Sequence, residues 1–90
     1  MKEQYGNFYF CKEQNEFGHL RKLKFRPHPD FIEFLKGRIE PMFRTYDKEA
    51  KQWIIYTDFF DQEILSTAVL LFDRIYTIED GDYTELFGKP

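Results

Sequence analysis

The side chains that most often carry chemistry are few in this sequence of 90 residues, and they lie far apart. The nitrogen and sulfur ligands preferred by zinc are Cys11, His19 and His28. No two of them have the CxxC or HxxxH spacing that is typical of a zinc site. We expect both histidines to be exposed, since His19 adjoins a turn and His28 lies between two prolines. We therefore predict no bound metal and no cofactor.

Groups for nucleophilic catalysis are also missing. Cys11 lies in a short aromatic-rich segment that reads as a strand, where a buried thiol is the usual outcome. Ser66 is the only serine, and it falls in a helical pattern without a GxSxG context. The five glycines are scattered singly, unlike a phosphate-binding loop. Because a nucleophile, a base and an orienting group do not occur together, we predict that the protein is not an enzyme.

The paired carboxylates have structural explanations. Thr57 or Asp58 is expected to cap a helix, with Asp61 in its first turn, where the helix dipole favours an acid. The EDGD segment at residues 79–82 consists of turn residues and lacks the twelve-residue pattern of a calcium loop. Neither group of acids indicates a catalytic pair.

A basic stripe is the strongest candidate for a binding function. Residues 19–28, HLRKLKFRPH, contain four Lys or Arg and no acid. On a strand, Lys22, Lys24 and Arg26 would project from one face at intervals of roughly 6.5–7 Å. This spacing is similar to that of successive phosphates on a nucleic-acid strand. Arg44 and Lys51 would extend the contact, whereas the alternative is that these lysines only protect a strand edge against aggregation.

The charge is divided unevenly along the chain. Residues 1–45 carry nine Lys or Arg against six Asp or Glu, and residues 46–90 carry four against ten, so that a net charge of −3 hides halves of +3 and −6. An acidic patch can imitate a phosphate backbone and bind a nucleic-acid-handling protein. The alternative is a solvated surface that maintains solubility. The candidate residues for the acidic patch are Asp73, Glu79, Asp80, Asp82 and Glu85.

Length and composition indicate one folded domain over residues 1–90. Aromatic residues make up 20% of the chain, which allows a dense core in a small protein. A single cysteine favours a reducing compartment, so we expect a cytoplasmic protein. No apolar run approaches the roughly 20 residues that cross a membrane, and residues 1–10 have no signal-peptide pattern.

Hydrophobic periodicity predicts an α+β fold with the order β-β-α-β-β-α-β. The expected strands are residues 6–12, 20–26, 42–47, 52–57 and 74–78, and the expected helices are residues 29–39 and 58–73. We predict two layers, a mostly antiparallel sheet of about five strands with both helices on one face. The predicted core includes Phe25, Phe34, Leu35, Tyr46, Trp53, Ile55, Ile64, Ala68 and Leu71.

One segment resembles a known family. FRPHPDFIEFLKGRIEPMFRTYDKEAKQWII combines a helix opened by Pro and Asp with a hairpin that carries Tyr-Asp, Lys and Trp. This pattern is similar to the HARP (HepA-related protein) domain of annealing helicases and to related small phage modules. The matching residues are Phe31, Phe34, Leu35, Lys36, Tyr46, Asp47, Lys48 or Lys51, and Trp53. Lys48 stands where the family has a proline, and the resemblance covers about residues 22–72.

The resemblance implies a non-catalytic module that engages branched or single-strand/double-strand junction DNA. Ninety residues leave no room for an adjacent motor, so we expect a stand-alone protein of a phage or mobile element that acts on DNA or on DNA-handling machinery. One alternative is an acidic protein-binding inhibitor of a host nuclease or defence complex. Another is a structural or assembly protein that forms homodimers through an exposed sheet edge.

Overall fold

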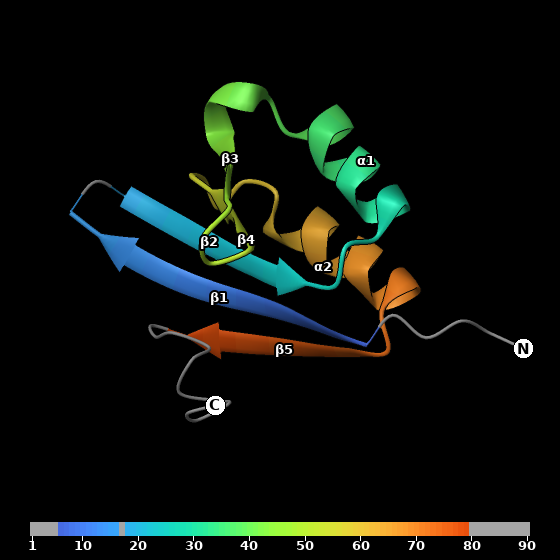
Figure 1. The fold of residues 1–90 in the computed structure, drawn as a ribbon. Helices are drawn as coiled ribbons and strands as arrows, with labels where there is room; N and C mark the ends of the chain where they lie inside the picture. Colours follow the sequence, from blue (N-terminus) through green and yellow to red (C-terminus); the bar gives the residue numbers. More distant parts are fainter. Residues whose placement is uncertain (1–5, 17, 80–90) are drawn as a thin grey trace, which may run out of the picture.

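The computed structural model describes residues 6–16 and 18–79, which form a five-stranded sheet and two helices (Figure 1). The elements are β1 (Asn7–Asn15), β2 (Gly18–Phe25), α1 (Pro29–Arg38), the 3₁₀ turn η1 (Pro41–Phe43), β3 (Arg44–Asp47), β4 (Gln52–Ile55), α2 (Asp61–Leu71) and β5 (Arg74–Glu79). The predicted α+β fold and its element order are confirmed. No helix in the described ranges is long and apolar enough to cross a membrane.

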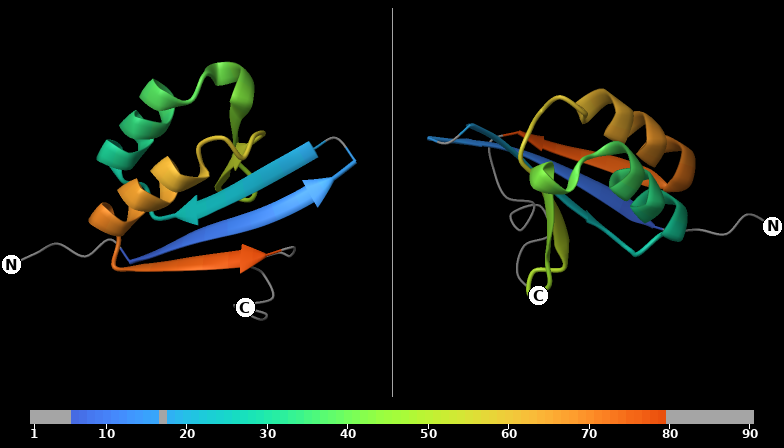
Figure 2. Two further views of the ribbon diagram at one scale, coloured as in Figure 1. Left: turned by 180° about the vertical axis from the view of Figure 1, so that it is seen from behind. Right: turned by 90° about the horizontal axis from the view of Figure 1, so that it is seen from above.

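The strands are arranged in the order β3-β4-β2-β1-β5. The β1–β2, β2–β4 and β3–β4 pairs are antiparallel, whereas β1 and β5 are parallel. Figure 2 shows both helices on the same side of this sheet, with the β3–β4 hairpin rotated strongly relative to β1, β2 and β5. The start of β1 is tied to the start of β5, since Asp73 N donates to Gly6 O (2.9 Å) and Gly6 N donates to Asp73 Oδ2 (3.0 Å).

The core lies between the sheet and the helices. Alternation along β1 turns Phe8 and Phe10 towards the helices, and both are fully buried. The ring of Phe8 meets that of Phe31 in α1 edge to face at 5.1 Å, and that of Phe72 after α2 at 5.2 Å. This cluster of rings supplies most of the buried aromatic surface in a small domain. Cys11, on the opposite face of β1, is also fully buried.

The predicted core residues divide into three groups. The buried ones are Leu35, Trp53, Ile55, Ile64 and Ala68. Phe25, Phe34 and Leu71 are half-buried and pack against that cluster. Tyr46 does not belong to the core, because 44% of its surface is exposed on the edge strand β3, where its ring packs against Trp53 at a centroid distance of 5.3 Å.

His28 corrects the expectation that both histidines are exposed. Its side chain is the N-cap of α1: Nδ1 accepts a hydrogen bond from Asp30 N at 3.2 Å. The ring also packs edge to face on Phe72 at 5.6 Å, and only 7% of the residue is exposed. Capping and packing together bury a side chain that its flanking prolines suggested was in a loop. His19, by contrast, is exposed as expected.

The second helix begins three residues later than predicted. α2 starts at Asp61, and neither Thr57 nor Asp58 caps it. Thr57 Oγ1 instead accepts from Phe59 N at 3.1 Å, which holds a turn ahead of the helix. The Asp61 carboxylate is directed to Arg21 on β2, with Nε–Oδ1 at 2.9 Å. The predicted cap at Thr57 or Asp58 is therefore wrong. Asp61 does lie in the first turn of the helix, but its carboxylate binds Arg21.

The β3–β4 hairpin forms as the Tyr-Asp and Trp pattern predicts. Asp47 Oδ1 accepts from the backbone N–H groups of Glu49 and Ala50, at 3.1 and 3.2 Å. Lys51 then takes a left-handed backbone conformation with φ of 56°. This turn returns the chain so that Trp53 and Ile55 face the core together.

Candidate nucleic-acid interface

Lys22 and Arg44 of the predicted basic set contact Glu13 and the end of α1, respectively. Lys22 lies on the helix-free face of the sheet, and its Nζ is 3.0 Å from Glu13 Oε2 on β1. Arg44 reaches back to the end of α1, where Nε donates to Ile39 O at 2.8 Å and Nη2 to Lys36 O at 3.4 Å. The Arg44 guanidinium thus satisfies carbonyl groups that the helix leaves unpaired.

The other three basic residues meet at the end of β2. β4 pairs with β2 only from Arg21 to Leu23, so the last residues of β2 extend past the hairpin. Lys24 lies on this extension, Arg26 directly follows it, and Lys51 of the β3–β4 turn lines the same pocket. Of the predicted basic stripe, Lys24 and Arg26 therefore lie near Lys51, whereas Lys22 pairs with Glu13.

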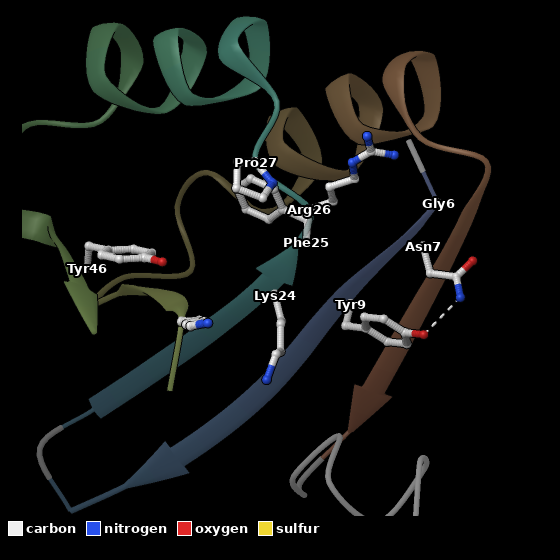
Figure 3. Close-up of a pocket in the computed structure, with 9 residues that line it drawn as sticks. Gly6, Asn7, Tyr9, Lys24, Phe25, Arg26, Pro27 and Tyr46 are labelled. Carbon is white, nitrogen blue, oxygen red and sulfur yellow. Dashed lines mark hydrogen bonds between the residues drawn. The ribbon is translucent and has the colours of Figure 1, made fainter. Parts of the chain in front are cut away.

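These three cations line a pocket of about 450 Å³, shown in Figure 3. Its apolar walls come from aromatic rings and a proline, and none of the described lining residues is acidic. The described lining consists of Gly6, Asn7, Tyr9, Lys24, Phe25, Arg26, Pro27, Tyr46 and Lys51. A positive rim over flat apolar walls suits a ligand that has both anionic groups and planar rings.

Contacts with Asn7 and Tyr76 hold the ring of Tyr9 in place in this pocket. Its hydroxyl accepts a hydrogen bond from Asn7 Nδ2 at 2.9 Å, as drawn in Figure 3. Its ring stacks on Tyr76 of β5 with a centroid distance of 5.2 Å and an interplanar angle of 12°. Lys24 is its direct neighbour across the β1–β2 pair. These contacts place an aromatic face and an ammonium group side by side on the helix-free surface.

The predicted acidic patch is not brought together in the described residues. Asp73 precedes β5 and accepts from the Gly6 N–H, whereas Glu79 ends that strand, 3.2 Å from Lys12 Nζ. These two acids lie at opposite ends of β5. The remaining three, Asp80, Asp82 and Glu85, lie outside the described residues.

Within residues 6–16 and 18–79, no group of three or more His, Cys, Asp and Glu side chains is arranged to hold a metal ion. The ion pair of Arg38 with Glu63 raises the pKa of the guanidinium, mainly through their hydrogen bond, and that bond lowers the pKa of the carboxyl. This pair links α1 to α2 at an exposed position.

Tyr9, Asn7 and the exposed ring of Tyr46 are the pocket residues that the sequence reasoning missed. Alternation does place Tyr9 and Lys24 away from the core on their own strands. Their contact depends on the register that pairs Tyr9 with Lys24, which strand patterns alone do not give.

Comparison with known proteins adds no relative. No protein-family model matches this chain, and neither the curated proteins nor the solved structures give a match. The resemblance to the HARP domain therefore stays a prediction, and the functional argument depends on the geometry of the pocket.

Proposed function

We propose that this chain is a non-enzymatic nucleic-acid-binding protein that holds single-stranded DNA, or the single-stranded arm of a junction, at the end of β2. The supporting observation is the pocket that Lys24, Arg26 and Lys51 line together with Tyr9 and Tyr46. Aromatic faces stack on unpaired bases of any sequence, and Lys and Arg neutralise the phosphates between them.

Two further considerations favour this function. The HARP-like pattern covers α1 and the β3–β4 hairpin, which contributes Tyr46 and Lys51 to the pocket, and that family acts on junction DNA. A single cysteine, buried in β1, suits a protein of the reducing cytoplasm, where DNA is handled. A module of this kind fits a phage or mobile element.

The salt dependence of binding tests the proposal. Each phosphate neutralised on a single strand contributes about −0.7 to the slope of log affinity against log salt. The three cations of the pocket therefore predict a slope of about −2 for a fluorescently labelled single-stranded oligonucleotide. Replacing Lys51 by Ala should make the slope shallower by about 0.7.

Lys48 provides the matched control for Lys51. It lies in the same β3–β4 turn and is exposed, but it does not line the pocket. Lys48→Ala should leave the slope nearly unchanged, although it removes the same charge from the same turn. An oligonucleotide affinity that does not respond to salt, or equal effects of the two substitutions, would contradict the proposed site.

A further inference from the structure

A second, smaller pocket adjoins the first on the helix side of the sheet. Its volume is about 220 Å³, and it lies between α1 and the β3–β4 hairpin. It is lined by Leu23, Phe25, Pro27, Ile32, Lys36, Tyr46, Lys51 and Trp53. Leu23 and Trp53 are buried and form its apolar base, whereas Tyr46, Lys36 and Lys51 are exposed.

The two pockets share one wall. Phe25, Pro27, Tyr46 and Lys51 line both of them. A flexible chain bound in the first pocket therefore passes Tyr46 and Lys51 before it reaches the second. The turn fixed by Asp47 positions Lys51 at this crossing, and Lys36 approaches from α1. Cationic side chains therefore line both pockets: Lys24 and Arg26 the first, Lys36 the second, and Lys51 both.

The size and lining of the second pocket limit the kind of ligand that it can hold. Pockets for drug-sized ligands measure roughly 300–1,000 Å³, so about 220 Å³ suits a single ring system rather than a whole nucleotide. Tyr46 and Trp53 supply aromatic walls, with their rings 5.3 Å apart and inclined by 57°. Lys36 and Lys51 favour an anionic group outside the pocket and disfavour a cationic occupant. A flat ring attached to an anionic backbone meets all of these conditions.

We propose that the second pocket receives one unstacked nucleobase of the bound strand, against Tyr46 and Trp53, while Lys36 and Lys51 hold the adjoining phosphates. This inference depends on the proposed nucleic-acid function and deepens it. It predicts a preference for single strands and junctions, because a base in a duplex must be unpaired and unstacked at an energetic cost before it can enter.

Trp53 makes base entry directly measurable. It is the only tryptophan of the chain and lines the second pocket but not the first. Titration with a short oligothymidylate should change its fluorescence in parallel with binding. Inorganic polyphosphate, which has the charge but no bases, should compete for binding without changing the Trp53 emission. A duplex of equal length should bind more weakly and change the emission less.

Variants separate the two pockets. Tyr46 lies on the edge strand and is 44% exposed, so Tyr46→Ala should keep the fold, which a circular dichroism melt would verify. We expect it to lose about fivefold or more in affinity, as for one lost base-stacking contact, and to lose most of the oligonucleotide-induced emission change. Tyr46→Phe should retain both. Tyr9→Ala, which alters only the first pocket, should weaken binding but preserve the emission change at saturation.

The outcomes distinguish this inference from the function beneath it. If oligothymidylate binds with the expected salt dependence but leaves Trp53 emission unchanged, the base pocket is wrong and the proposed function stands. The same holds if polyphosphate produces an equal emission change, or if Tyr46→Ala retains the full emission change. If no oligonucleotide binds even at low salt, the proposed function and the base pocket both fail.

Discussion

Removing the carboxylate of Asp61 leaves the guanidinium of Arg21 without its ion-pair partner in a position that water scarcely reaches. Arg21 Nε lies 2.9 and 3.1 Å from the two Asp61 carboxylate oxygens, and Nη2 lies 2.9 Å from Oδ2. The exposed fractions of the two side chains are 8% and 25%. Arg21 Nη1 also donates to Leu20 O at 3.2 Å. The pair fastens the first residue of α2 to the centre of the sheet.

The geometry predicts strong coupling between the two residues. Asp61→Ala should destabilise the protein by about 3–5 kcal/mol, because a buried charge loses its partner. Arg21→Met removes the charge and keeps the apolar stem, and the α2 dipole still favours the Asp61 carboxylate. We therefore expect this variant to lose about 1–3 kcal/mol of stability. The double variant contains no uncompensated charge. Its loss of stability should be smaller than the sum of the two single losses by about 1–3 kcal/mol.

Urea denaturation followed by circular dichroism measures all four proteins of this cycle. A domain of this size has a total stability of roughly 5–13 kcal/mol, so each variant should remain measurable at low temperature unless the parent is at the lower end. The exposed pair Arg38 and Glu63, which also joins α2 to another element, provides the control. Its coupling should be much smaller, since water screens it. Additive effects at Arg21 and Asp61, with coupling no larger than in the control, would refute the reasoning.

Two further predictions concern the core and the acid response. Trp53→Ala should cost roughly 3–5 kcal/mol, because the ring is 9% exposed and packs in the core, and a native-like melt of this variant would contradict that burial. Arg38 lowers the pKa of Glu63 below its ordinary value of 4.5, so this pair stabilises the fold above that pH and loses its contribution as pH falls through the lowered pKa. Glu63→Gln should therefore be less stable than the parent near neutrality and approach it in acid; a constant difference measured by urea denaturation at several pH values would exclude this linkage.

Local patterns were sufficient for the elements but not for their arrangement. The spacing of Phe31 and Leu35 identifies α1, and the alternation of Phe8 and Phe10 identifies β1, because each depends on residues close together in the sequence. The parallel pairing of β1 with β5 joins Asn7 to Arg74, and no local signal encodes that register. The strand order therefore had to come from the structure.

The same limit explains why the basic stripe was only partly informative. Lys22 and Lys24 are equivalent in the sequence, each on the polar face of one strand. The register places Glu13 within reach of Lys22, whereas Lys24 lies beside Tyr9 at the pocket. Arg44 was expected to contact phosphate, but the end of α1 engages its guanidinium. A side chain's partner across the sheet or on another element decides its role, and that partner is distant in the sequence.

The β3–β4 hairpin carries two adjacent rings with different roles. Trp53 contributes mainly to stability, whereas Tyr46 is available for binding. Trp53 faces the core and also forms a wall of the smaller pocket, so its removal would impair folding before any effect on binding could be measured. Tyr46 packs against it from the edge strand and is far more exposed than Trp53. Substitution of Tyr46 consequently tests the ligand site while the core remains intact.

Lys51 offers a second such position, because its exposed ammonium group lines both pockets and its backbone only shapes the turn. If Tyr46 and Lys51 variants melt like the parent but lose oligonucleotide affinity, the Tyr-Asp-Lys-Trp pattern serves two purposes. Asp47 and Trp53 build the hairpin, and Tyr46 and Lys51 present its binding surface.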